Sequence, residues 1–170
     1  MNNLTRKIEL LANVGIICVA LLIGAAFAKN HLFQTTSAKL AAPASVPAGA
    51  KLSLPGVDWA QSEKTLVLAL NKGCRYCSNS ASFYQQLARE TAGHRDVRLI
   101  AVLPQEVAEG KKYLDELKVP IQEIKQAPLD SLGVTGTPTL ILLDKTGSVT
   151  AAWTGQLPAD KEPDVLRRLL

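Results

Sequence analysis

The stretch Asn71–Tyr84, with the sequence NKGCRYCSNSASFY, places Cys74 and Cys77 three residues apart, where an apolar run gives way to a helical pattern. The apolar run is Thr65–Leu70, TLVLAL, which has the length of a strand that is buried on both faces of a sheet. The first cysteine therefore falls between the end of a strand and the start of a helix. Its spacing from the second is compatible with a redox couple, half of a metal site or two inert thiols.

The position of Cys74 predicts a reactive thiolate. Unpaired backbone N–H groups and the positive end of the helix dipole stabilise a thiolate, and beside cationic groups thiol pKa values there fall to about 3.5–7.5. Arg75 adds such a charge directly beside the sulfur. Cys77 follows about one helical turn later on the same face, close enough for a disulfide. We therefore expect Cys74 to attack a partner disulfide and Cys77 to resolve the mixed disulfide that results.

The other two interpretations of the cysteine pair have less support. A structural zinc site needs four ligands, and the only histidines are His31 and His94. His94 stands between Gly93 and Arg95, where an exposed turn residue is expected. Inert thiols would be buried, whereas the residues on either side of the pair are polar, so both sulfurs are expected to meet solvent. We expect redox activity with no metal and no other cofactor.

Length and charge narrow the class of protein further. The chain has 170 residues, enough for one ordinary domain with additional segments. Its formal net charge of +4 comes from scattered basic residues interleaved with acidic ones. A nucleic-acid-binding surface would need a basic stripe with aromatic residues, so we expect no nucleic acid partner.

The segment Leu10–Ala28 predicts a membrane anchor, because it contains no charged residue and is long enough to cross a hydrocarbon core as a helix. Arg6 and Lys7 before it favour a cytoplasmic location for residues 1–9. A cleaved signal peptide remains the alternative, since Ala26-Phe27-Ala28 has the small-x-small form of a cleavage site.

The anchor is predicted to be followed by a tether and one exported domain. Residues 29–50 are rich in Ala, Pro and Ser, as in an extended linker, and the domain is expected to occupy residues 51–170. Because exported thiols meet an oxidising compartment, a disulfide between Cys74 and Cys77 is the default expectation. Its loop is too short to add much stability, which favours a chemical purpose.

The periodicity of the domain predicts an α/β fold, a mixed sheet flanked by helices. A strand-helix-strand unit comes first, and a two-stranded hairpin and a closing helix come last. The expected strands are residues 65–70, 96–103, 139–144 and 149–155, and the expected helices are 78–91, one within 105–119, a short one at 127–132 and 160–170.

The order of these elements, the Cys-Arg-Tyr-Cys motif of residues 74–77 and LGVTGTPTLILLDKTGSV at residues 132–149 resemble the thioredoxin superfamily. With its predicted anchor the chain is most similar to membrane-tethered, TlpA-like thiol-disulfide oxidoreductases of the bacterial envelope. This resemblance implies a cis-proline at Pro138 that faces the cysteine pair. It also implies that the backbone of Thr137 binds the cysteine-containing segment of a partner.

Three departures from the family pattern affect the expected chemistry. Gly73 stands where the family usually has Trp, and Arg75 and Tyr76 replace the Gly-Pro pair of thioredoxins. Leu68 stands where thioredoxins carry a buried acidic residue. Any proton transfer at Cys77 must then use water or another group.

The resemblance implies an enzyme of the bacterial inner membrane, with a single span and its domain in the periplasm or cell exterior. Its partners would be exported proteins with cysteine pairs and an upstream redox donor or acceptor, and reduction is slightly favoured over oxidation. The alternatives are a non-catalytic binding module that uses the Thr137–Pro138 groove and a peroxiredoxin-like peroxide reductase. The latter lacks its usual Thr, because Asn71 stands three residues before Cys74.

Overall fold

The computed structural model describes residues 46–170. The predicted anchor at Leu10–Ala28 lies outside these residues, as do residues 1–9 and most of the predicted tether. Within the described part of the chain, no helix is both long enough and apolar enough to cross a membrane.

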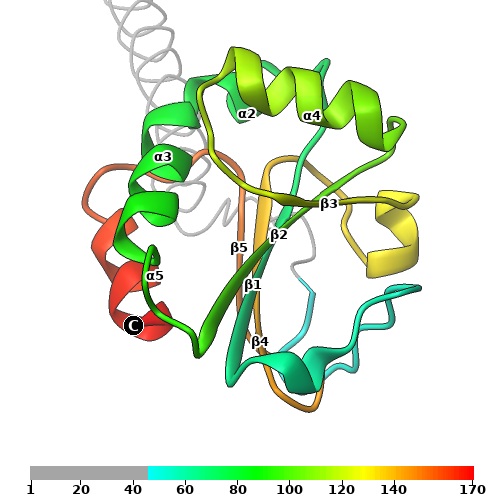
Figure 1. Ribbon diagram of the computed structural model, residues 1–170, viewed down its shortest axis with the longest axis vertical. Coiled ribbons are helices and arrows are strands. Elements are labelled where there is room, and N and C mark those ends of the chain that lie inside the picture. Colours follow the sequence, from blue (N-terminus) through cyan, green and yellow to red (C-terminus); the bar gives the residue numbers. More distant parts are fainter. Residues whose placement is uncertain (1–45) are drawn as a thin grey trace, which may run out of the picture. The chain divides into compact units, whose positions relative to one another are not determined.

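A five-stranded sheet with the order β3-β2-β1-β4-β5 forms the centre of the domain (Figure 1). Neighbouring strands among β1, β2 and β3 run parallel, whereas β4 is antiparallel to both β1 and β5. The predicted mixed sheet is therefore confirmed. The strands are β1 (Lys64–Ala69), β2 (Val97–Leu103), β3 (Glu123–Gln126), β4 (Thr139–Asp144) and β5 (Val149–Thr154).

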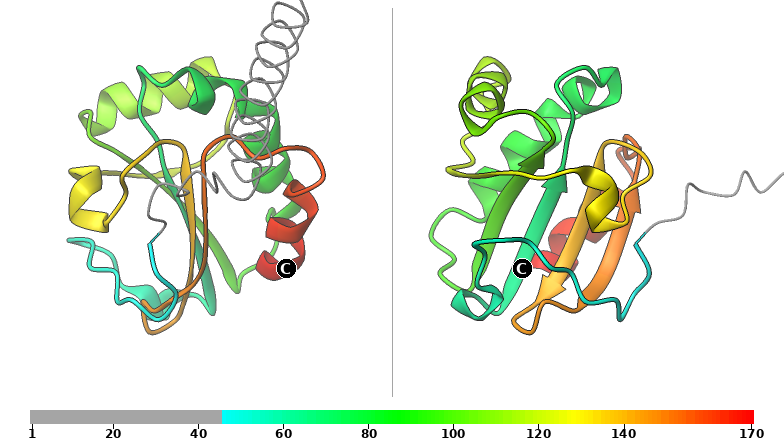
Figure 2. Two further views of the ribbon diagram at one scale, coloured as in Figure 1. Left: turned by 180° about the vertical axis from the view of Figure 1, so that it is seen from behind. Right: turned by 90° about the vertical axis from the view of Figure 1, so that its right-hand side faces the viewer.

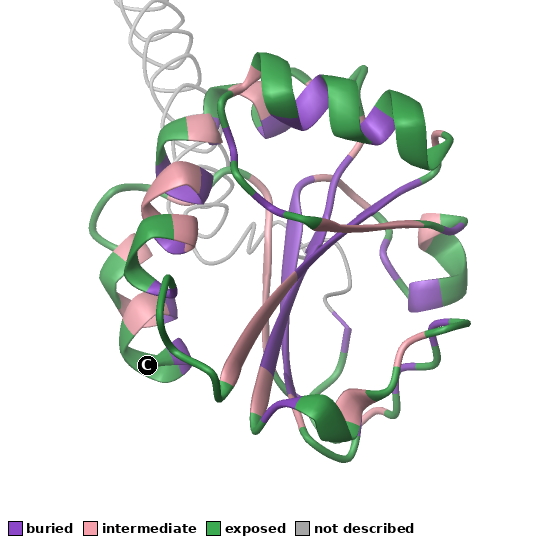
Figure 3. Cartoon of the chain, viewed as in Figure 1, coloured by how far each residue is buried: buried purple, intermediate pink, exposed green. Residues whose placement is uncertain are grey.

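The central strand β1 is buried on both faces, as its continuous apolar run predicted (Figure 3). Leu66 and Leu68 point into one hydrophobic cluster, and Val67 and Ala69 point into the other. Because side chains alternate along a strand, a shift of one residue would exchange the two clusters. The register of β1 is thereby strongly specified.

Three helices pack on one face of the sheet, and the other face is covered mainly by chain segments with little regular structure (Figures 1 and 2). The helices are α3 (Ala81–Glu90), α4 (Val107–Glu116) and α5 (Glu162–Leu169). The opposite face is covered by the segment after Val46, by the neighbourhood of the 3-10 turn η1 (Trp59–Gln61) and by the 3-10 turn η2 (Leu129–Leu132).

The single helix predicted over Ser78–Thr91 is wrong in one respect. The structure has a short helix α2 (Arg75–Asn79), then Ser80, then α3. Ser80 Oγ donates a hydrogen bond to the Tyr76 carbonyl four residues earlier, at 2.9 Å. Such bonds from serine back to the preceding turn bend helices, which accounts for the interruption.

The sequence analysis also missed the edge strand β3. Its four residues, EIKQ, are half-buried or exposed, and only Ile124 packs against a core cluster. A short polar edge strand has no apolar run to mark it, although its backbone pairs with β2 from Ile100 to Leu103. The sheet therefore has one more strand than predicted.

Gly110 lies in the middle of α4, where glycine usually weakens a helix. A Cβ atom there would lie 3.2 Å from Leu103 Cδ1 and 3.3 Å from Ile124 Cγ2. The missing side chain thus lets α4 approach β2 and β3 closely, which compensates for the loss of helix propensity.

Gly147 lies in the turn between β4 and β5, and replacing it tests how tightly this turn is packed against Trp59. Its φ is +75°, and an added Cβ would lie 2.6 Å from the Trp59 ring, whose Nε1 donates to the Leu52 carbonyl. We expect Gly147→Ala to lower the free energy of unfolding by about 2–4 kcal/mol, from backbone strain and overpacking together. Chemical denaturation of the domain measures this.

Gly49→Ala is the matched control, because Gly49 also has a positive φ, +84°, with nothing within 4 Å of its added Cβ. Gly49→Ala should lower the free energy of unfolding only by the backbone strain of a positive φ, about 1–2 kcal/mol. Equal losses in the two variants would show that the Trp59 ring moves aside freely.

Candidate functional site

Cys74 lies just beyond the carboxyl end of β1 and is the N-cap of α2. Its Sγ accepts a hydrogen bond at 3.3 Å from the Cys77 backbone N–H, a donor of the first helical turn that also donates to the Cys74 carbonyl at 3.1 Å. The Cys74 backbone N–H in turn donates to the Asn71 carbonyl at 2.9 Å. The predicted placement of this sulfur at a strand-to-helix turn is confirmed.

The loop before the pair is held by Asn71, which the sequence analysis did not select for this role. Its Oδ1 accepts hydrogen bonds from the Gly73 backbone N–H at 3.0 Å and from Gln105 Nε2 at 3.2 Å. Asparagine commonly bonds to the backbone two residues later in tight turns, so the Asn-Lys-Gly sequence carried this signal. Gln105 comes from the loop after β2 and ties the two loops together.

The structure brings Thr137 and Pro138 to the cysteine pair from the loop before β4. The Cys74 thiol donates to the Thr137 carbonyl oxygen at 3.1 Å, although 63 residues separate them in the chain. The Thr137–Pro138 peptide bond is cis, as the family resemblance implied. Beyond it, the Pro138 carbonyl accepts from the Gly155 backbone N–H at 2.7 Å, which connects this loop to the end of β5.

The two sulfurs occupy opposite environments. Cys74 is half-buried and borders the core cluster, whereas Cys77 has no exposed surface and belongs to that cluster. The expectation that both sulfurs meet solvent is therefore wrong for Cys77. The polar residues around it in the sequence face outward, while its own position on α2 faces the sheet.

The ionisation of the two thiols differs accordingly. Burial opposes the Cys74 thiolate, but hydrogen bonds from the side chains of Thr137 and Cys77 and from the backbone of Cys77 and Tyr76 outweigh it, so the Cys74 pKa is lowered. Burial raises the pKa of Cys77 to about 12, helped by its hydrogen bond to Cys74 and by the charge there. Cys74 is thus the more acidic and the more accessible of the two thiols.

Arg75 follows Cys74 at the first position of α2, and it is exposed to solvent. Burial and hydrogen bonding are the largest effects on the Cys74 pKa. Because an exposed charge is screened by water, the tuning role predicted for Arg75 stays a prediction.

A hollow of about 370 Å³ lies beside the cysteine motif. Tyr76, from between the two cysteines, forms one wall, and it is 59% exposed. The segment Gly155–Pro158 after β5 forms the rest. This largely apolar hollow offers room for a side chain beside Tyr76, between the two cysteines in sequence, and the sequence analysis did not identify it.

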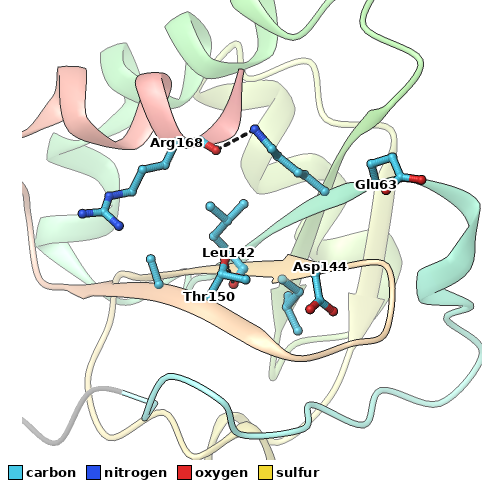
Figure 4. Close-up of a pocket in the computed structure, with 8 residues that line it drawn as sticks. Glu63, Leu142, Asp144, Thr150 and Arg168 are labelled. Atoms are coloured by element: carbon cyan, nitrogen blue, oxygen red, sulfur yellow. Dashed lines mark hydrogen bonds between the residues drawn. The ribbon is translucent and has the colours of Figure 1, made fainter.

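A second hollow, of about 400 Å³, lies at the opposite end of β1 from the cysteines (Figure 4). Lys64 borders it and donates to the Arg168 carbonyl at 2.9 Å, near the end of α5. Glu63, Asp144 and Arg168 add both signs of charge. Among residues 46–170, no three His, Cys, Asp or Glu side chains gather closely enough to hold a metal ion.

Comparison with known proteins gives consistent matches over this domain. The sequence profile of the Thioredoxin-like domain family matches residues 60–169. None of the curated proteins compared with the chain matches it.

Solved structures match the fold at low sequence identity. A thiol:disulfide interchange protein of the thioredoxin family from Chlorobium tepidum has a TM-score of 0.56 at 15% identity, over 72% of this chain and 97% of that one. A thiol-disulfide isomerase from Corynebacterium glutamicum has 0.54 at 17%, over 74% and 93%. The thioredoxin domain of a thiol-disulfide oxidoreductase from Bacteroides vulgatus has 0.52 at 19%, over 75% and 96%.

The difference between the two sulfurs predicts the order of alkylation. With its pKa near 12 and no exposed surface, Cys77 should remain a protected thiol at neutral and mildly acidic pH. Cys74, whose pKa is lowered, should react with iodoacetamide on the order of a hundred-fold faster or more. Pulse labelling of the reduced protein followed by peptide mass mapping gives both rates.

Unfolding the reduced protein in guanidinium chloride before the pulse is the control, because it should make the two rates similar. Equal labelling of the folded protein, or faster labelling of Cys77, would contradict the assignment of Cys74 as the nucleophile.

Proposed function

This chain belongs to the thioredoxin-like domain family, and from that premise we propose that it is a thiol-disulfide oxidoreductase acting on cysteine pairs of exported proteins. The observation that carries the proposal is the contact between Cys74 Sγ and the Thr137 carbonyl at a helix N-terminus. The family profile supplies the fold, whereas this contact sets a thiol of lowered pKa beside a backbone segment at which a partner can pair. The solved structures support the same class, since their names describe thiol-disulfide chemistry.

The proposed cycle uses the two thiols in sequence. The Cys74 thiolate attacks one sulfur of a partner disulfide, and the other partner sulfur leaves as a thiolate. Cys77, one turn away on α2, then attacks Cys74 Sγ in the mixed disulfide and releases the partner in its dithiol form. The result is an oxidised Cys74–Cys77 pair, which an upstream donor must reduce again.

Substrate binding is proposed to involve the backbone at Thr137 and the hollow beside Tyr76. The Thr137 carbonyl lies 3.1 Å from the attacking sulfur, so an extended partner segment that pairs there would bring its own sulfur to Cys74. A neighbouring apolar side chain of that segment would fit between Tyr76 and Leu157. Main-chain pairing of this kind recognises a segment largely independently of its sequence.

We place the domain outside the cytoplasm of a bacterium, tethered to the inner membrane, and we favour reduction of its partners. The uncharged segment Leu10–Ala28 and the resemblance to TlpA-like proteins support this location. The same resemblance favours a reductant that keeps exported thiols reduced. The lowered Cys74 pKa instead stabilises the reduced pair, which would favour oxidation of partners, so the direction needs a direct measurement.

The first test is capture of the partner. Cys77→Ser removes the resolving thiol, so Cys74 should remain joined to its substrate in a mixed disulfide that survives non-reducing electrophoresis. Cys74→Ser, the matched control, should trap nothing. Purified wild-type domain should reduce insulin in the presence of a dithiol donor, whereas either variant should lose at least about 99% of that activity.

Three outcomes separate the candidate functions. Captured cytochromes or metal-delivery proteins would support reduction, whereas many newly exported cysteine proteins would support general oxidation. The equilibrium with glutathione gives the potential independently. A wild-type protein that binds partners but neither reduces nor oxidises disulfides would be a binding module, and the proposed function would be wrong.

The second test addresses location. Full-length protein should partition with membranes, and a reporter that is active only in the periplasm should be active when fused after Leu170. Replacing Leu10–Ala28 by a known cleaved signal should release an active soluble domain. Native mature protein that begins at Lys29 and is recovered in the soluble fraction would contradict the anchor.

A further inference from the structure

The resolving step requires a Cys77 thiolate, which the buried position of this cysteine disfavours. Cys77 must become a thiolate to attack Cys74, yet it is fully buried, and burial raises its pKa to about 12. Leu68, where an acidic residue could have assisted, is also fully buried and lies in the same hydrophobic cluster. Hydrogen bonds of the Asn71 backbone and the Thr137 side chain lower the Cys77 pKa, but burial outweighs them. A further group able to stabilise the nascent thiolate must therefore come from elsewhere.

Cys74 is the titratable group that acts on the Cys77 pKa, and Cys77 in turn acts on two tyrosines of the helices packed around it. The charge of Cys77 acts on Tyr84 of α3 and on Tyr113 of α4, and both tyrosines belong to the same buried cluster. No carboxylate or amine stands among the main influences on the Cys77 pKa. The two tyrosine hydroxyls are thus the polar groups to compare.

These hydroxyls differ in how they are bonded. The Tyr113 hydroxyl lies 3.2 Å from Ser78 Oγ, which completes a hydrogen bond. The Tyr84 hydroxyl is buried, with 1% of the residue exposed, and has no hydrogen-bond partner among the described residues. Ser80 is near enough to lower the Tyr84 pKa through hydrogen bonding, but its Oγ makes no hydrogen bond to the hydroxyl in this structure and donates its own proton to the Tyr76 carbonyl at 2.9 Å.

A buried hydroxyl without a partner costs free energy, and such groups are uncommon in folded proteins. Phenylalanine would fill the same space without that cost. The packing of Tyr84 suggests what the hydroxyl serves, because Tyr84 on α3 and Cys77 on α2 belong to the same buried cluster.

We propose that the Tyr84 hydroxyl donates a hydrogen bond to the Cys77 sulfur as that sulfur becomes a thiolate, and so promotes the resolving step. The inference rests on the proposed thiol-disulfide function. The dithiol structure does not contain this bond. Active-site hydrogen bonds often tighten only when charge develops, and the unpaired Tyr84 proton is available for that moment.

Tyr84 acts in this step as a donor and not as a base. Burial raises its pKa far above the usual value, and a nearby Cys77 thiolate raises the pKa further, so the phenol keeps its proton throughout. In the balanced step, the Cys77 sulfur bonds to Cys74 Sγ while the bond from Cys74 to the partner sulfur breaks. The partner sulfur takes the electron pair and ends as a thiol, with the proton that Cys77 gave up.

The test separates attack from resolution with a small aromatic disulfide, dithiobis(nitrobenzoate), which needs no protein partner. Attack by Cys74 on this reagent releases one coloured nitrothiobenzoate anion, and resolution by Cys77 releases the second. Stopped-flow absorbance on the reduced domain follows both phases. Tyr84→Phe should slow the second phase about ten-fold at neutral pH and leave the first within two-fold.

The pH profile and the controls exclude a merely structural role. The second phase of Tyr84→Phe should rise with pH over a higher range than in the wild type, because its Cys77 lacks the donor. Tyr113→Phe is the matched control and should change the second phase less than two-fold. Tyr84→Phe should unfold no more easily than the wild type, since it removes an unpaired hydroxyl.

If Tyr84→Phe folds poorly, Tyr84→Met provides a second apolar replacement without the hydroxyl, and it should slow the same phase. An unchanged second phase in any folded variant without the hydroxyl would overturn the proposal, as would equal slowing by Tyr113→Phe. Two clean phases in a wild-type protein that never acts on protein disulfides would refute the proposed function alone. Insulin turnover with an unaffected second phase in Tyr84→Phe would refute this inference alone.

Discussion

The pairing of β1 with β4 is the interaction on which the site depends. Its register sets Ala69 opposite Thr139, so the residues just after one strand meet those just before the other. Cys74 and Thr137 therefore come within hydrogen-bonding distance across 63 residues of chain. Because β1 is buried on both faces, a slip of one residue would move leucines between two filled clusters, and the core thus protects the alignment of the site.

One helical turn then gives two identical side chains opposite properties. Cys74 caps α2 and borders the solvent, where hydrogen bonds favour its thiolate. Cys77 points from the same helix toward the sheet, where burial outweighs the hydrogen bonds of the Asn71 backbone and the Thr137 side chain that favour its thiolate. The interruption at Ser80 keeps α2 short and makes it a unit separate from α3. Two thiols of opposite ionisation therefore arise on one short helix.

The cluster around Cys77 contains the hydroxyl groups of Tyr84 and Tyr113. A neutral hydroxyl is buried at much lower cost than a charge, and it can still donate a hydrogen bond to an anion. A buried tyrosine such as Tyr84 keeps its proton at ordinary pH because burial raises its pKa, so it cannot act as a base. Such a site would stabilise a thiolate transiently without holding a permanent charge in the core.

The sequence by itself determined the features that are local. The apolar run of β1, the cysteine spacing and the helical pattern after it follow from periodicity and from the residue types that cap helices. The hairpin of β4 and β5 was equally visible, and the family resemblance pointed to Pro138. Periodicity failed to predict two local features. The edge strand β3 has no apolar run, and at Ser80 a hydrogen bond to the Tyr76 carbonyl interrupts the predicted helix.

Only the tertiary structure decided the properties that depend on what surrounds a residue. The polar neighbours of Cys77 in the chain suggested exposure, but helix orientation buries it. The partnership of Asn71 with Gln105 and the unpaired hydroxyl of Tyr84 likewise arise from elements that are distant in sequence or from packing. The physical reason is that a pKa depends on desolvation and hydrogen bonds in three dimensions, whereas periodicity records only which side of a helix or strand a residue occupies.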